Sequence, residues 1–384
     1  VRHSKRSEKA GKLIAWGVIV AVFSILSIVM DLSNGGDFSI VSVVTGVQLL
    51  NAIKEMSPLP VYIDESGQWR TGRELFDVKA AKSPEKLKKV FPRPGSRGLY
   101  TSRGRKIADM DAAVLCCHGM NGEDGTLQGL LELCGVPYTG SGVLASALCM
   151  DKAAFKRFAE SEGIPTVPYV TYTRREFNGD IYAVADRLDG IGYPFMIKPA
   201  RLGSSIGVGV ARNERELVEA SRTAFAFDNR VIAERLLENF RELNCAALGD
   251  ERVVTVSDVE EPLGWKEFLS YEDKYSGGKA LMRRRLPAEI PDDVTEEVKR
   301  LTRLVFEKAG LSGVVRVDFM LAQSGELYLN EVNTLPGSLA AYFFRRAGMR
   351  ETEFVRRLVD IAERRFRDES RLTYSYSSPA VTGK

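Results

Sequence analysis

The chain has 384 residues, of which 44% are hydrophobic and 27% charged, a composition typical of a globular protein with two or three domains. Its net charge of +3 is small for this length, and no basic run with interleaved aromatics occurs, which argues against nucleic-acid binding. The five cysteines lack CxxC spacing and only two histidines are present, which argues against a disulfide framework, a zinc site or a multi-histidine metal site. We therefore expect reduced, buried thiols in a cytoplasmic protein.

An uncharged apolar segment, residues 13–30, follows a basic N-terminal stretch. It is long enough for a membrane helix, and the basic flank would hold the N-terminus in the cytoplasm. A single span would then place the rest of the chain outside the cell, which conflicts with the chemistry indicated further along the sequence. The segment is also rich in Val and Ile, which suits a buried parallel strand. We favour a first strand, with residues 1–32 as an atypical leader, over a membrane contact of residues 13–30.

Short apolar runs predict strands at residues 61–63 and 111–117, and helical patterns around them indicate a parallel sheet in the N-terminal region. Residues 83–105 are rich in Lys, Arg, Pro and Gly, so an exposed loop is expected there. Asp151 should cap a helix that ends at Gly163. Further strands are predicted at residues 193–199 and 231–234, and further helices at residues 214–225, 294–309 and 351–366.

A β-hairpin is predicted between residues 313 and 332, where two apolar runs flank the dipeptide Ser324-Gly325. We take the loop as two residues long, which fixes the pairing of the two strands. Because side chains alternate between the faces of a strand, one face forms a core surface. That face would carry Val317, Phe319, Tyr328 and Val332.

The opposite face of this hairpin would place Asp318 across from Glu331, and Arg316 across from Asn333. Two opposed carboxylates repel strongly unless a cation lies between them. Hard oxygen ligands of this kind suit Mg²⁺, with Mn²⁺ as an alternative. The competing interpretation is an edge hairpin whose charges are solvated.

A second informative segment is Lys198 and the Gly/Ser loop that follows it at residues 203–207. Glycine lets backbone N–H groups approach phosphate oxygens, serine adds hydroxyl donors, and lysine supplies a point charge. The loop lacks the GxxxxGK[ST] pattern, so a simple turn is the competing interpretation. The acidic hairpin and two further lysines, Lys152 and Lys274, favour a nucleotide-phosphate site.

Further motifs occur in a fixed order along residues 111–366. They are His118-Gly119 with Gly122-Glu123-Asp124-Gly125, residues 137–142, Asp151-Lys152, the Lys198 loop, Glu234 with Glu242, Lys274-Tyr275, Arg316-Val-Asp318, and Glu331-Val-Asn333 with residues 334–339. Together they resemble the D-alanine–D-alanine ligase family of ATP-grasp enzymes. The resemblance implies an α/β fold of the α+β ATP-grasp type. An N-terminal parallel-sheet domain, residues 1–140, would precede two ATP-grasp subdomains that clamp the nucleotide, residues 141–234 and 235–372, and a flexible tail, residues 373–384.

The resemblance also implies roles for individual residues. The ATP-binding residues would be Lys152, Lys198, Ser205, Glu234, Arg235, Leu236, Leu237, Glu242 and, from a mobile loop at residues 269–280, Lys274. The ligands of Mg²⁺ would be Asp318, Glu331 and Asn333. The residues at the reacting groups would be Arg316, Ser204, Tyr275 and Gly337. The amino-acid pocket would be formed by His118, Ser338, Leu339 and Asp37.

In this family ATP phosphorylates the carboxylate of a first D-alanine, and the amine of a second then displaces phosphate, giving D-alanyl-D-alanine for peptidoglycan. A tyrosine at the position of Tyr275 goes with an amine as second substrate. One departure concerns the glutamate that binds the first ammonium group: counting back from the expected helix at residues 41–48 places Phe38 there, with Asp37 as the nearest acid. The alternatives are therefore an ATP-grasp ligase for other amino acids, or a nucleotide-binding relative that has lost catalysis. Small amino acids are the expected partners, and a homodimer is an expectation taken from the family.

Overall fold

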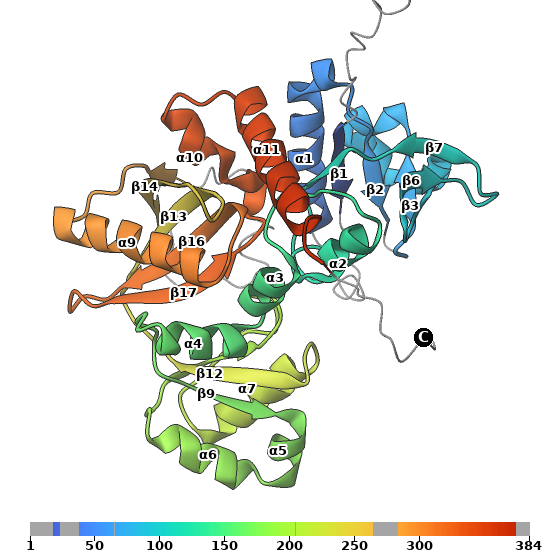
Figure 1. Ribbon diagram of the computed structural model, residues 1–384. Helices are drawn as coiled ribbons and strands as arrows, with labels where there is room; N and C mark the ends of the chain where they lie inside the picture. The colour runs from blue at the N-terminus through green and yellow to red at the C-terminus, as the bar shows by residue number, and fades with distance from the viewer. Residues whose placement is uncertain (1–17, 24–37, 65, 204, 264–282, 374–384) are drawn as a thin grey trace, which may run out of the picture.

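The computed structural model describes residues 18–23, 38–64, 66–203, 205–263 and 283–373, and in this part of the chain helices pack against four β-sheets (Figure 1). The first sheet has the strand order β4-β3-β2-β1-β8. Its strands are β1 (Val18–Phe23), β2 (Val61–Ile63), β3 (Trp69–Thr71), β4 (Lys88–Lys89) and β8 (Ala112–Leu115). β1 pairs in parallel with β2 and β8, whereas β3 and β4 add antiparallel strands at one edge.

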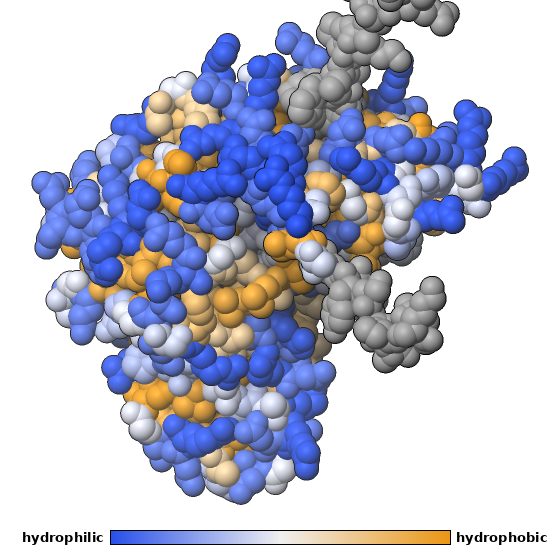
Figure 2. Space-filling view, viewed as in Figure 1, coloured by the Kyte–Doolittle hydropathy of each residue, from blue (hydrophilic) through white to orange (hydrophobic). Residues whose placement is uncertain are grey.

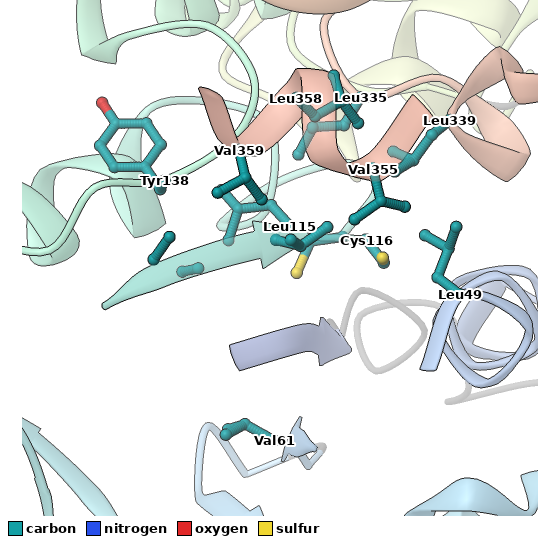
Figure 3. Packing of buried hydrophobic residues seen from close by; sticks show 14 of the residues in the cluster. Leu49, Val61, Leu115, Cys116, Tyr138, Leu335, Leu339, Val355, Leu358 and Val359 are labelled. Carbon is teal, nitrogen blue, oxygen red and sulfur yellow. The ribbon is translucent and has the colours of Figure 1, made fainter. Parts of the chain in front are cut away.

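The predicted first strand is confirmed by β1, which lies inside the apolar segment and at the centre of the parallel part of the sheet. Within the described residues, no helix combines the length and the apolar character needed to cross a membrane. Helices α1 (Phe38–Ala52) and α11 (Glu351–Glu369) contact this sheet and each other (Figure 1). Below α11, Leu115 at the end of β8 and Cys116 directly after it lie close to Val355 and Val359 (Figure 3). All five cysteines are free and buried, as expected.

The expectation of an exposed loop at residues 83–105 is wrong. This segment contains β4 and part of an antiparallel three-stranded sheet, with Val90 and Leu99 fully buried in the core. The strands of that sheet are β5 (Phe91–Arg93), β6 (Ser96–Tyr100) and β7 (Lys106–Asp109). The basic residues that suggested a loop are compatible with strands because one face of such a sheet remains in water. Short one-turn helices precede it, namely η1 (Lys54–Met56), η2 (Arg73–Phe76), η3 (Val78–Lys82) and η4 (Pro84–Lys86).

A separate four-stranded antiparallel sheet has the order β11-β10-β12-β9. Its strands are β9 (Tyr169–Thr173), β10 (Phe195–Pro199), β11 (Gly209–Ala211) and β12 (Arg230–Arg235). The helices packed against its core are α5 (Arg174–Gly179), α6 (Ile181–Asp189) and α7 (Glu214–Phe225). Helix α4 (Lys152–Ser161) precedes this sheet, and Asp151 caps it as predicted by accepting from the backbone N–H of Ala154. Two further short helices lead to α4, namely α2 (Thr126–Leu133) and α3 (Val143–Met150).

The last sheet has the order β15-β14-β13-β16-β17 and is covered on both faces. Its strands are β13 (Arg241–Gly249), β14 (Val254–Leu263), β15 (Arg283–Arg285), β16 (Gly313–Leu321) and β17 (Leu327–Asn333). Helix α9 (Asp292–Lys308) packs against one face of this sheet, and the buried side chains of that face include Cys245, Val317 and Phe319. The one-turn helix η5 (Gly337–Ala340) contacts β16, and α10 (Ala341–Arg346) contacts β14. The outer faces of the helices are largely hydrophilic in the view of Figure 2.

Gly313, the first residue of β16, should be one of the least replaceable glycines. Its φ is +75°, and a Cβ there would lie 2.8 Å from the backbone nitrogen of Gly140. Gly310 also has a positive φ, +63°, but a Cβ there would meet nothing within 4 Å. We expect Gly310→Ala to cost about 1–2 kcal/mol from backbone strain alone, and Gly313→Ala to cost at least about 1 kcal/mol more, measured by urea unfolding. Equal losses in the two variants would contradict this close approach.

Candidate active site

The hairpin formed by β16 and β17 brings together the four polar residues expected on one face. Asp318 pairs with Glu331, and Arg316 pairs with Asn333. Arg316 donates to both carboxylate oxygens of Asp318, from Nε to Oδ1 at 2.6 Å and from Nη2 to Oδ2 at 2.7 Å. Asn333 Nδ2 donates to Asp318 Oδ2 at 3.0 Å. The predicted pairing at this site is therefore confirmed.

The two-residue loop was wrong, and a second irregularity compensates for it. Ala322 N donates to Glu326 O, which leaves three residues in the loop. A register shift beside Asp318 absorbs the difference, so the pairs near the site keep the predicted register. Between the shift and the loop, the residues of β17 lie on the face opposite to the one predicted. Leu329 therefore enters the core in the place predicted for Tyr328, which is half-buried.

A row of polar side chains extends from the hairpin across the sheet. Asp318 pairs with Asn244 of β13, which in turn pairs with Glu260 of β14. With its amide nitrogen turned to donate, Asn244 lies 3.1 Å from Asp318 Oδ1. Sequence reasoning missed Asn244 and Glu260, although Glu242 was expected at the site and Asn244 lies two residues further along the same strand face.

The ion pair with Asp318 keeps Arg316 positively charged. Burial lowers the pKa of Arg316, but Asp318 outweighs burial and raises that pKa well above its ordinary value. Asp318 is only 3% exposed, so the pair lies in a largely dry part of the site. A fixed cationic group beside a carboxylate is suited to stabilising negative charge that develops in a reaction.

A buried cluster of one glutamate and two lysines lies at the end of β12. Lys198 Nζ of β10 is 2.7 Å from Glu234 Oε2, and Lys156 Nζ of α4 is 3.2 Å from Glu234 Oε1. Glu234 is 2% exposed. Burial raises the pKa of Glu234, but the two lysines together outweigh burial and hold that pKa at about 2. The predicted residues Lys198 and Glu234 are thus in contact, whereas Lys156 was missed despite lying one helical turn after Lys152.

Lys152 connects three parts of the candidate site. Its Nζ donates to the carbonyl of Leu202 at 2.6 Å, just before the Gly/Ser loop, and lies 3.9 Å from Glu331 Oε2 of the hairpin. Burial lowers the pKa of Lys152. In that loop Ser205 has a left-handed backbone with φ +63°. The structure therefore brings the lysine, the loop and the acidic hairpin into one place, as the sequence predicted.

His118 is tied to the segment that follows the hairpin. Its Nδ1 lies 2.7 Å from the carbonyl of Leu335, and Thr334 Oγ1 donates to the carbonyl of Glu123 at 3.2 Å. Burial raises the pKa of Glu123 to about 7. The loop at residues 118–125 therefore reaches the same site as residues 334–340, and the role of His118 in the amino-acid pocket stays a prediction.

His118 should remain neutral at physiological pH. Burial lowers its pKa from 6.5 to about 4, against the opposing contact with the Leu335 carbonyl. A base whose folded pKa is depressed adds stability above its unfolded pKa, and that stability is lost as pH falls from about 6.5 through 4. The chain has only two histidines, so NMR titration with His118→Gln as the assignment control measures this directly. An imidazole at this position that protonates near pH 6.5 would contradict the buried placement.

The one-turn helix η5 has an unusual backbone. Ser338, Leu339 and Ala340 all have positive φ, between 47° and 53°. Ser338 is exposed and the side chain of Leu339 is buried in the core (Figure 3). Leu339 can therefore reach a substrate only through its backbone, whereas Ser338 offers a hydroxyl. Such strain is commonly found at functional sites.

Some of the remaining predicted residues are described by the structure and others are not. Arg235 is exposed and Leu236 and Leu237 are half-buried directly after Glu234, while the half-buried Glu242 lies on β13 opposite Met320, on the face that carries Asp318. Gly337 begins η5. Outside the described residues lie Asp37, Ser204, Lys274 and Tyr275.

The donor set at the hairpin fits a hard divalent cation. Among the described residues, no group of three His, Cys, Asp or Glu side chains gathers at metal-binding spacing. The hairpin instead offers two opposed carboxylates and one amide, from Asp318, Glu331 and Asn333. Mg²⁺ is usually held by one or two carboxylates together with substrate phosphates and water, so this set is sufficient only if a phosphate-bearing substrate binds beside it.

Comparison with known proteins agrees with this geometry. The family models "D-ala D-ala ligase N-terminus" and "D-ala D-ala ligase C-terminus" match residues 39–141 and 158–360. The D-alanine–D-alanine ligase of Thermosipho melanesiensis is 34% identical over 337 residues, which cover 86% of this chain and 91% of the relative.

Two solved structures are also similar. D-alanyl-alanine synthetase A from Vibrio cholerae is 28% identical with a TM-score of 0.73, covering 85% of this chain and 96% of its own. The VanG D-Ala:D-Ser ligase from Enterococcus faecalis is 28% identical with a TM-score of 0.71, covering 83% and 95%. The chain therefore belongs to the D-alanine–D-alanine ligase family.

Proposed function

We propose that this protein uses ATP to join two D-alanines through an acyl phosphate, giving D-alanyl-D-alanine for peptidoglycan precursors. The observation that carries the proposal is the meeting of Lys152, Glu331 and Asp318 beside the Gly/Ser loop. Phosphoryl transfer requires positioned cations around phosphate oxygens, and this cluster supplies them next to a carboxylate pair that can hold a metal. We also propose a cytoplasmic location, because the reaction uses ATP.

The nucleotide would lie between the sheet of β9–β12 and the sheet of β13–β17, which correspond to the two ATP-grasp subdomains of the proposal. Lys152 and Lys198 would neutralise phosphate oxygens, and Ser205 would donate to them. The base and ribose would be contacted by Glu234, Arg235, Leu236, Leu237 and Glu242. The buried pairing of Glu234 with Lys156 and Lys198 supports this, because it fixes the position of Lys198 before any ligand binds.

Asp318, Glu331 and Asn333 would hold Mg²⁺, which when bound supplies charge neutralisation to the transferring phosphoryl group. A carboxylate is a poor electrophile, so an oxygen of the first D-alanine carboxylate first attacks the γ-phosphorus and ADP leaves. The amine of the second D-alanine then attacks the carbonyl carbon, and the bond to phosphate breaks. Arg316, with Gly337 N–H, would stabilise the oxyanion that forms in this second step.

The direct test is product analysis with the purified protein. With ATP, Mg²⁺ and D-alanine we expect equal amounts of ADP, phosphate and D-alanyl-D-alanine, and with L-alanine none of the dipeptide. Chelation of Mg²⁺ should stop the reaction. ADP release without dipeptide, or dipeptide formation from other amino acids but not from D-alanine, would reject the proposal.

A further inference from the structure

A cavity of about 180 Å³ lies beside the left-handed turn of η5, bordered by α1, β15 and α10. Its polar lining includes Arg284, Tyr342, Ser338, Thr45 and Gln48. At about 30 Å³ per water, it has room for roughly six water molecules, which is enough for a small amino acid. None of the metal ligands, phosphate-binding lysines or nucleotide-contacting residues of the proposed function lines it.

The cavity adjoins the candidate active site through Tyr342. Tyr342 and Arg316 interact electrostatically, and Arg316 is the guanidinium paired with Asp318. Ser338 belongs to the turn that begins at Gly337, four residues after Asn333. A small molecule in this cavity would therefore lie next to the place where the acyl group reacts.

Arg284 is held in a fixed position at the cavity wall. Its Nε is 3.2 Å from Glu260 Oε1, and its guanidinium carbon lies 4.3 Å from the centre of the Tyr342 ring. Tyr342 completes the arrangement by donating its hydroxyl to Glu260 Oε2 at 2.6 Å. The Glu260 side chain is 3% exposed and that of Arg284 is 42% exposed, so the carboxylate is enclosed while the guanidinium reaches open space.

The charges around the cavity favour a carboxylate as its ligand. Glu351, the acid among the residues that line the cavity, pairs with Arg345, and Glu260 behind the lining is already bound by Arg284 and Tyr342. A guanidinium has five N–H donors, of which the ion pair with Glu260 uses Nε. The donors that remain match the planar, two-oxygen geometry of a carboxylate.

We infer that Arg284 binds the carboxylate of the second, amine-donating amino acid, and that Glu260 and Tyr342 are positioning residues that orient its guanidinium. This inference rests on the proposed function. The inference explains why the buried Glu260, at the end of the polar row across the sheet, pairs with Arg284 at the cavity. Together they would hold the carboxylate of the acceptor away from the reacting carbonyl, so that its amine is left to attack.

The test is a competition between two acceptors, D-alanine and D-alaninamide, in which only D-alanine can supply the acyl group. The measured quantity is the ratio of D-alanyl-D-alanine to D-alanyl-D-alaninamide from an equimolar mixture. This ratio depends on the specificity of active molecules and not on how much of a variant folds. Intrinsic reactivity differences between the two amines cancel when variants are compared.

We expect the wild-type protein to prefer D-alanine, Arg284→Gln to lower the product ratio by at least about tenfold, and Arg284→Lys to give an intermediate ratio. Tyr342→Phe should lower the ratio less than Arg284→Gln because it removes only the hold on Glu260. The matched control is Arg285→Gln: Arg285 is the next residue on β15 and pairs with Glu261 and Glu289. Its product ratio should equal that of the wild-type protein.

An unchanged ratio in Arg284→Gln, or an equal fall in Arg285→Gln, would overturn the inference while leaving the proposed function intact. Failure of the proposed function has a different signature, because the wild-type protein would then form neither product.

Discussion

Replacing Glu331 with glutamine is expected to lower kcat by at least about a hundredfold while leaving the free energy of unfolding within about 0.5 kcal/mol of the wild-type value. Glu331 lies opposite Asp318 at the proposed metal site, and glutamine keeps its size but removes its charge. The side chain is 34% exposed and its ion pair with Lys152 is long, 3.9 Å, so this ion pair contributes little to the free energy of unfolding. ADP release and urea unfolding measure the two effects separately.

The control for this variant is Glu326→Gln, at the residue directly before the other end of β17. Glu326 is exposed and accepts a hydrogen bond from Ser324 in the hairpin loop, far from the polar face. It should leave kcat unchanged. Near-normal turnover by Glu331→Gln, or an equal loss in both variants, would remove the metal assignment from this hairpin.

Replacing Glu234 with glutamine should have the largest effect on stability, about 3–5 kcal/mol, and should also raise the KM for ATP. The substitution leaves two ammonium groups, those of Lys156 and Lys198, without their shared carboxylate in a buried position. Lys198 would then no longer be held where a phosphate is proposed to bind. Glu238→Gln, at an exposed position four residues later, should change neither quantity.

The pH dependence of this cluster has a definite sign. The pKa of Glu234 is lowered from 4.5 to about 2 in the folded protein, so its stabilisation is complete above about pH 4.5 and is lost as pH falls toward 2. At 1.36 kcal/mol per pKa unit the difference is about 3 kcal/mol, in line with the expected cost of the substitution. Glu234→Gln should therefore flatten this part of the acid-unfolding curve.

The double variant Lys156→Met with Glu234→Gln should be more stable than Glu234→Gln alone, and a less stable double variant would contradict the shared-carboxylate account.

Much of the site could be predicted because it depends on strand periodicity and motif order. Pairing across the hairpin placed Asp318 opposite Glu331 correctly, even though the loop length was wrong, because the register shift beside Asp318 compensates. A bulge of this kind has no reliable sequence signal, since it depends on how the strand packs against its neighbours. The family resemblance, carried by many motifs in order, is confirmed by the family models.

Other features could not be predicted because they depend on contacts between distant segments. Lys156 was missed because a lysine on a helix is usually solvated, and only its packing against β12 shows that it is 1% exposed. Glu260 and Arg284 are on different strands, and their contact with Tyr342 of α10 appears only in the fold. Residues 83–105 were misjudged because the many charged, Pro and Gly residues around Val90 and Leu99 gave no sign that these two side chains are buried.

The central claim is that this site activates a carboxylate by phosphorylation. It is tested most directly by supplying D-alanine labelled with ¹⁸O in both carboxyl oxygens and analysing the released phosphate by mass spectrometry. Attack of a carboxylate oxygen on the γ-phosphorus, followed by displacement by an amine, must leave one labelled oxygen in each phosphate and the other in the peptide carbonyl. We expect one ¹⁸O per phosphate, formed in step with D-alanyl-D-alanine. Phosphate that carries no label would contradict the account.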